Sequence, residues 1–190
     1  MANKVQFGLC DVVISKITVG NDGTFTYGTP FSIPGAVNLS LDPAGDEADF
    51  AADNNAKYFV DWANNGYTGT LEMALIGDEF REKILGQYVD VNGAILENSG
   101  DTISPFALGF RINGDSKNTK FWYYNCIASR PSQTGATTDT SRTPQTETLN
   151  ITAMQRPSDG AVRVYMTESS SNTAAYASFF TNVYEKTLSV

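Results

Sequence analysis

Apolar side chains recur at every second position along much of this chain. Val37, Leu39 and Leu41 alternate with polar neighbours, which places the three on one face of a β-strand. The same alternation recurs in residues 70–75, 106–112, 149–153 and 162–167. A strand with one apolar face has to bury that face against another layer. The sequence therefore predicts a mainly β protein, an antiparallel β-sandwich or partial barrel of about eight to ten strands.

Three further stretches refine this prediction. Phe121 to Tyr124 is apolar on both faces, which indicates a central strand covered on both sides, either by its own chain or by a partner. A helix is predicted from Asp78, as the N-cap, to Leu85, with Gly86 following as the terminating glycine. The spacing of aromatic residues within 173–182 predicts a weaker, short C-terminal helix laid on the sheet.

Length and charge limit the class of protein. The chain has 190 residues, which fits a single domain spanning 1–190. It carries 13 basic and 21 acidic side chains, a formal net charge of −8. An acidic surface repels phosphate, so ordinary nucleic-acid binding is not expected. We see no secretion signal and no apolar run near the roughly 20 residues of a membrane helix, so we expect synthesis in a cytosol and no membrane partner.

The residue types on which most catalytic and metal sites depend are absent or badly spaced. Histidine is missing, and the two cysteines, Cys10 and Cys126, form no CxxC pair; we expect both thiols to be buried and reduced. The carboxylates around Asp46 and around Asp78 are crowded only locally, which favours a solvated loop and a helix N-terminus over a catalytic pair. The acids between residues 42 and 53 lack EF-hand spacing. We expect no enzyme activity, no cofactor and no metal.

Two segments break the strand pattern. Residues 42–65 form a long predicted loop that is rich in Asp and Asn yet carries four large aromatic side chains. Such side chains usually dock onto their own domain or onto another chain, and composition leaves both alternatives open. Residues 129–144 form a Ser/Thr-rich predicted loop without an apolar anchor. Long loops of this kind are usually functional or mobile in compact domains.

Seven stretches, in order and spread over nearly the whole chain, carry a resemblance to one protein family. They are VQFGL, YGTPFSIPGAVNLSLDPAGD, NNGYTGTLEMALIGDEFREKILG, NGAILEN, PFALGFRINGD, TKFWYYNC and FFTNVYE. With these stretches the chain resembles the major tail proteins, or tail tube proteins, of long-tailed, non-contractile bacteriophages of Gram-positive bacteria.

The resemblance implies a structural protein of the virion, made in the cytoplasm of the bacterial host. Family members have a β-sandwich or partial barrel with a flanking helix, which the predicted helix 78–85 matches. Six copies close into a ring, and stacked rings form the hollow tail tube through which genome DNA passes without specific binding. A lumen lined with acids or neutral amides would not trap phosphate. The chain ends at Val190, so no extra C-terminal immunoglobulin-like domain is expected.

The resemblance also implies the partners and a contact site. The partners are further copies of the chain itself and the tape measure, distal tail and tail terminator proteins. Family members carry an extended loop at the position of 42–65 that reaches the adjacent ring. The residues expected to make this inter-ring contact are Asp42, Asp46, Glu47, Asp49, Phe50, Asp53, Tyr58, Phe59 and Trp62.

Three alternative functions stay open at this point. The chain fits equally a tube subunit of a related injection machine, which shares the fold. A carbohydrate-binding β-sandwich module would use exposed aromatic residues such as Trp62 or Trp122. An enzyme would depend on one of the carboxylates.

Overall fold

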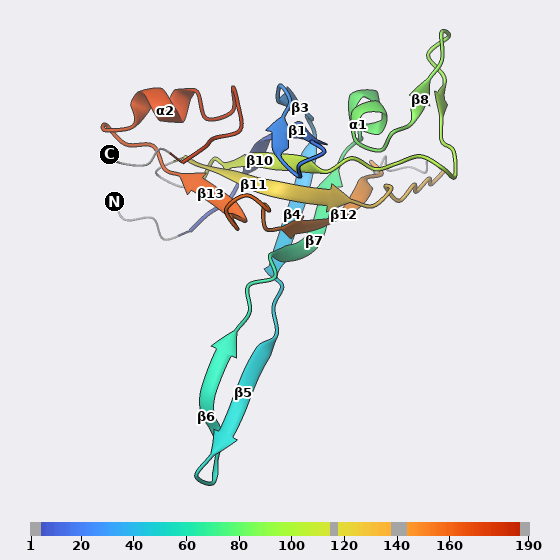
Figure 1. Ribbon diagram of the computed structural model, residues 1–190. Coiled ribbons are helices and arrows are strands. Elements are labelled where there is room, and N and C mark those ends of the chain that lie inside the picture. Colours follow the sequence, from blue (N-terminus) through green and yellow to red (C-terminus); the bar gives the residue numbers. More distant parts are fainter. Residues whose placement is uncertain (1–4, 115–117, 138–143, 187–190) are drawn as a thin grey trace.

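The computed structural model describes residues 5–114, 118–137 and 144–186, and this part of the chain is mainly β (Figure 1). Two short helices are present, α1 (Asp78–Lys83) and α2 (Thr173–Ala177). The strands are β1 (Leu9–Val19), β2 (Phe25–Tyr27), β3 (Phe31–Ser32), β4 (Ala36–Pro43), β5 (Glu47–Ala52), β6 (Asn55–Trp62), β7 (Tyr67–Met73), β8 (Tyr88–Val89), β9 (Ile95–Leu96), β10 (Phe106–Ile112), β11 (Thr119–Ala128), β12 (Glu147–Met154) and β13 (Arg163–Met166). The predicted mainly β, antiparallel fold class is confirmed.

Nine of these strands form one sheet in the order β2-β1-β10-β11-β12-β7-β4, with β3 paired to β1 and β13 paired to β11. Strand β11 serves two neighbours along one edge: Lys120–Tyr123 pairs with β13, and Asn125–Ala128 pairs with β12. The sheet therefore divides along β11 and wraps around an apolar interior. It does not close as a barrel, because within the described residues β4 pairs only with β7.

Strand β11 has an apolar cluster on each of its faces. Tyr123 and Cys126 belong to the larger cluster, together with side chains from β1, β7, β10, β12 and α1. Trp122 and Tyr124 belong to a second cluster that includes Phe179, and the indole Nε1 of Trp122 donates a hydrogen bond to the Phe179 carbonyl oxygen at 2.8 Å. The predicted central strand is confirmed, and its cover comes from the chain itself.

Both predicted helices are present, but their ends differ from the prediction. Asp78 is the first helical residue and not the cap; the cap is Gly77, whose carbonyl oxygen accepts hydrogen bonds from the first turn. Asp78 therefore favours the helix through its charge at the N-terminus. Helix α2 ends at Ala177, before the predicted Asn182. The Ser178 hydroxyl there donates to carbonyl oxygens of the preceding turn, and such bonds disfavour continuation of a helix.

A buried arginine ties the C-terminal segment to the sheet. Arg156 is only 6% exposed and donates to both carboxylate oxygens of Asp159 at 2.9 Å and to Glu185 at 2.6 Å. Its guanidinium carbon also lies 4.4 Å from the centre of the Tyr124 ring. The hydrogen bonds from Arg156 hold the pKa of the Asp159 carboxyl well below its usual range. These contacts anchor the segment that follows α2.

The two thiols lie in different environments. Cys126 is buried, as predicted, and burial raises its pKa to about 12. Cys10 is only half-buried, so the prediction of a second buried thiol is wrong. The cause is local: the register of β1 shifts just after Cys10, and Asp11 there has a φ of 51°, so the regular alternation of inward and outward side chains is interrupted.

The predicted Ser/Thr-rich loop 129–144 begins as an extension along the sheet. The backbone N–H groups of Ser129 and Ser132 donate to the carbonyl oxygens of Asn150 and Thr148. Residues 133–137 follow without regular structure, and residues 138–143 of the predicted loop lie outside the described residues.

Candidate functional site

The segment predicted as a long loop is a β-hairpin that projects from the body of the molecule (Figure 1). Strands β5 and β6 pair only with each other within the described residues. Their two-residue turn, Asp53 and Asn54, has φ angles of 51° and 61°. Turns with positive φ at both central positions match the twist of the flanking strands, and Asp and Asn tolerate this conformation. The segment predicted as a loop thus contains two paired strands, and the Asp53-Asn54 pair is the sequence signal for their turn.

A short neck of backbone hydrogen bonds joins the hairpin to the main sheet. Ala44 N–H donates to Gly66 at 2.9 Å, Asn65 N–H to Ala44 at 2.8 Å, and Ala63 N–H to Asp46 at 3.1 Å. Gly66 has a φ of 93°, and a Cβ at this position would overlap the backbone of β12. The neck thus continues the ladder between β4 and β7 and requires glycine where the chain passes β12.

The hairpin exposes large apolar side chains that its own chain does not cover. Phe50 is 62% exposed, Tyr58 60%, Phe59 59% and Trp62 66%. All strand residues of β5 and β6 except Ala52 are exposed. Of the two alternatives left by the sequence, docking onto the same domain is therefore excluded for these four aromatic residues. Apolar surface gathered in this way is typical of a protein interaction site.

Apolar side chains occupy both faces of the hairpin. Directly opposite residues of an antiparallel pair share a face. Phe50 lies opposite Phe59 on one face, whereas Trp62 lies opposite Glu47 on the other. The first face therefore combines the two phenylalanines with Asp61, and the second combines Trp62 and Val60 with Glu47 and Asp49.

The hairpin and its neck concentrate the negative charge of the protein. Residues 42–62 hold six carboxylates and one lysine, a net charge of −5 out of −8 for the chain. The lysine, Lys57, forms an ion pair with Glu47. The structure brings most of the sequence-predicted contact residues together on the hairpin. Two lie elsewhere: Asp46 at the neck, and Asp42 on β4, opposite Thr68 of the main sheet.

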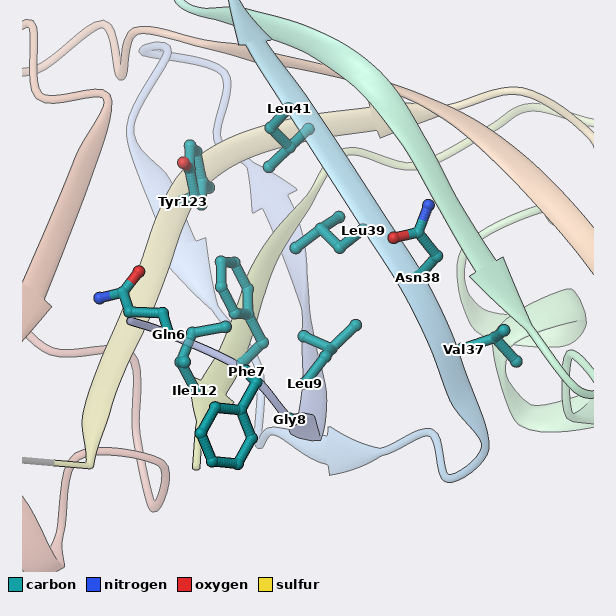
Figure 2. Close-up of a pocket in the computed structure, with 11 residues that line it drawn as sticks. Gln6, Phe7, Gly8, Leu9, Val37, Asn38, Leu39, Leu41, Ile112 and Tyr123 are labelled. Atoms are coloured by element: carbon teal, nitrogen blue, oxygen red, sulfur yellow. The ribbon is translucent and has the colours of Figure 1, made fainter. Parts of the chain in front are cut away.

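A groove lies on the body, between β4 and the N-terminal segment (Figure 2). It has a volume of about 460 Å³. None of its described lining residues has a charged side chain. Its apolar and aromatic lining residues include Phe7, Leu9, Val37, Leu39, Ile112 and Tyr123. Phe7 and Val37 at its rim are 67% and 52% exposed. The groove is the open seam of the sheet, where β4 has no further strand beside it.

Sequence reasoning missed this groove because its lining residues come from four separated segments. The N-terminal segment is held in place by the carbonyl oxygens of Phe7 and Gly8, which accept hydrogen bonds from Gly114 and Asn113. Val37 is the extra residue in the register shift between β4 and β7, which explains why this alternating apolar position points outward and is exposed.

The outer face of β4, β7 and β12 is polar and lacks basic residues. Cross-strand neighbours on this face are Ser40, Thr70 and Asn150 in one row, and Asp42, Thr68 and Thr152 in the next, with Asn38, Glu72 and Thr148 in a third. The opposite face of the same strands is the apolar core. This surface therefore presents hydroxyls, amides and two carboxylates, without lysine or arginine.

The residues weighed for metal, catalytic and sugar-binding sites can be placed in the structure. No group of three or more Cys, Asp or Glu residues within them is arranged to hold a metal ion. One acid of helix α1 has a local partner, since Glu79 pairs with Lys83 at 2.6 Å. Trp122 is fully buried, so of the two tryptophans only Trp62 is accessible for stacking on a sugar. None of the described helices has the length and apolar character needed to cross a membrane.

Comparisons with known proteins give structural similarities only. No family model matches the chain, and no curated protein matches it in sequence. A chain of the anti-feeding prophage baseplate is similar with a TM-score of 0.45 and 13% identity, over 87% of this chain and 97% of that chain. A chain of the anti-feeding prophage tube-terminating cap is similar with a TM-score of 0.46 and 9% identity, over 88% and 95%. Similarities with TM-scores below 0.5 carry no functional argument.

Proposed function

We propose that this chain is the structural subunit of a phage tail tube, in which six copies form a ring and rings stack into a hollow cylinder. The observation that carries the proposal is the projecting hairpin, with four large aromatic side chains exposed and no cover from its own chain. A monomeric protein gains nothing from such a surface, whereas an assembling subunit buries it. The resemblance to tail tube proteins supplies the kind of assembly.

The hairpin makes the contact between rings in this proposal. It points away from the body (Figure 1), and backbone hydrogen bonds at the neck continue its ladder into the main sheet. Its contact residues are Glu47, Asp49, Phe50, Asp53, Tyr58, Phe59 and Trp62. Asp42 and Asp46, which lie outside the hairpin strands, are not needed for this contact.

Contacts within a ring would use the sheet edges. Strands β2 and β13 are short, and within the described residues each pairs with one neighbour only. Unpaired edges are templates for strands of another chain. Pairing them between neighbouring copies would join the six sheets into one wall.

The polar outer face of β4, β7 and β12 suits the lumen of such a tube. Phosphate groups of passing DNA bind where lysine or arginine replaces their counter-ions, and this face has neither. Asp42 and Glu72 would repel DNA weakly and keep it mobile. In this role the protein is a virion component without enzyme activity, and its further partners are the tape measure, distal tail and tail terminator proteins.

Removing the hairpin tests the proposal. Residues 47–62 are replaced by an Asn-Gly turn that joins Asp46 to Ala63, whose backbones are already hydrogen-bonded at 3.1 Å. Removing only 46–55 would leave β6 without a partner. We expect a folded protein with unchanged thermal stability that no longer forms tubes under conditions where the complete chain does. A matched control shortens the β8–β9 hairpin at residues 90–94 and should assemble normally; normal tubes without the β5–β6 hairpin would refute the inter-ring role.

A tube subunit of a related injection machine is the alternative that the same observations support. It would use the same hairpin, edges and polar face. The neighbouring genes separate the two: capsid and tape-measure genes indicate a phage. The carbohydrate-binding alternative predicts a monomer that binds glycans through Trp62, and binding that a Trp62→Ala variant abolishes would support it.

A further inference from the structure

We infer that the groove between β4 and the N-terminal segment is the receptor for the β5–β6 hairpin of a second copy. The inference rests on the proposed function, because it assumes that copies of this chain assemble. It adds the surface onto which the hairpin docks. The face that enters the groove is the one with Phe50 and Phe59.

The exposed aromatic surface on the docking face is part of what a stable contact needs. At roughly 200 Å² for a fully exposed aromatic side chain, Phe50 and Phe59, each about 60% exposed, present about 240 Å². A standard interface buries about 800 Å² on each partner. The two phenylalanines thus supply about a third of that area, and the remaining atoms of the hairpin supply the rest. The groove offers apolar surface of its own, since Phe7 and Val37 at its rim are mostly exposed.

The charges on the hairpin favour its Phe50–Phe59 face for docking. None of the groove's described lining residues is charged, so covering the two phenylalanines buries no charged side chain of the groove itself. This hairpin face carries one carboxylate, Asp61, whereas the opposite face places Glu47 and Asp49 beside Trp62. The Phe50–Phe59 face therefore brings fewer charges to the groove.

An arginine beside the groove complements the acidic hairpin. Arg163 is exposed, and its Nη1 lies 3.4 Å from the hydroxyl of Tyr123, which lines the groove. It takes part in none of the ion pairs found among the described residues. On the hairpin, Asp61 lies opposite Ala48 and shares the face of Phe50 and Phe59. Docking would bring this carboxylate towards the unpaired guanidinium.

The arrangement of groove and hairpin favours a growing stack over a closed dimer. The groove lies on the body, whereas the hairpin of the same chain extends away from it (Figures 1 and 2). A contact between two different surfaces of one chain leaves a free hairpin at one end and a free groove at the other. Each added copy therefore presents the next receptor, as stacking of rings requires.

Cross-linking between copies tests the docking directly. One protein carries Phe59→Cys and the other Val37→Cys, both with Cys10→Ser so that the half-buried native thiol does not react. The two are assembled together, oxidised and separated without reductant. We expect a cross-linked dimer at least tenfold more abundant than in a control in which Val37→Cys is replaced by Tyr88→Cys, a position of 60% exposure on β8. Tubes that form without this preference for position 37 would overturn the groove assignment and leave the tube function standing.

A charge exchange provides a second readout. Arg163→Asp should raise the critical concentration for assembly at least tenfold, and adding Asp61→Arg should restore it. Because Arg163 also lies over the Tyr67 ring at 5.0 Å, thermal unfolding of each variant is measured alongside. Failure of the second change to restore assembly, with both variants folded, would contradict the proposed pairing. A complete chain that never assembles would remove both the tube function and this inference.

Discussion

Replacing Tyr58 by serine isolates the contribution of the hairpin surface to assembly. Tyr58 is 60% exposed, and so is Tyr88 on β8, which makes Tyr88→Ser a matched control outside the hairpin and the groove. The exposed part of Tyr58 is about 120 Å². If an adjacent ring buries it fully, the lost contact corresponds to about 2–3 kcal/mol per subunit. The critical concentration for tube formation should then rise roughly 30- to 150-fold.

The free energy of unfolding of the isolated subunit should not change to the same extent. Tyr58 lies on a strand whose other residues are also exposed, and surface substitutions of this kind change the free energy of unfolding by less than about 0.5 kcal/mol. The assay combines light scattering over a concentration series with chemical denaturation of the unassembled protein. Equal effects of Tyr58→Ser and Tyr88→Ser on assembly would refute the reasoning. A loss of unfolding free energy that accounts for the whole effect of Tyr58→Ser would also refute it.

Three further predictions concern stability and thiol chemistry. Gly66→Ala should destabilise the fold by about 1–3 kcal/mol, because it combines a positive φ with overlap onto a backbone carbonyl; Gly100→Ala, which has open space around it, should be neutral in the same denaturation experiment. Arg156→Met should cost about 3 kcal/mol. Since the folded pKa of Asp159 is depressed, the pair stabilises the protein fully above about pH 4, and this contribution is lost as the pH falls from there towards the folded pKa; the variant should show a weaker acid dependence in denaturation at pH 2–6. Cys126, buried and with its pKa raised to about 12, should resist thiol reagents in native protein and react in denaturant, and rapid native labelling at this position would contradict its burial.

The sheet could be predicted because its strands carry their own pattern. Leu39, Leu71 and Leu149 alternate with polar residues and meet in register in the structure, so the period of two was enough to find them. The strand around Trp122, which is buried on both faces, could also be predicted, because a run of four apolar residues leaves neither face of a strand suited to solvent. The residues that cover this strand could not be predicted from the sequence. Phe179, whose carbonyl oxygen accepts the hydrogen bond from Trp122, lies 57 residues away in the chain.

The candidate site was harder to predict because its sequence gives mixed signals. The acids of the hairpin suggest a solvated loop, and its aromatic residues suggest burial, so composition alone could not separate a docked loop from a projecting hairpin. The two tryptophans show the same limit: Trp62 is 66% exposed and Trp122 is buried, although both lie in aromatic surroundings. The difference arises from tertiary cover, which Trp122 receives and Trp62 does not. The lining residues of the groove come from β1, β4, β10, β11 and the N-terminal residues. No local sequence pattern predicts that these segments meet.

Negative-stain electron microscopy of the concentrated, purified protein, with sedimentation alongside, tests the central claim most directly. The tail tube function predicts hollow tubes of uniform diameter or six-membered rings formed by this chain. A protein that stays monomeric at every concentration and binds a glycan through Trp62 would contradict it.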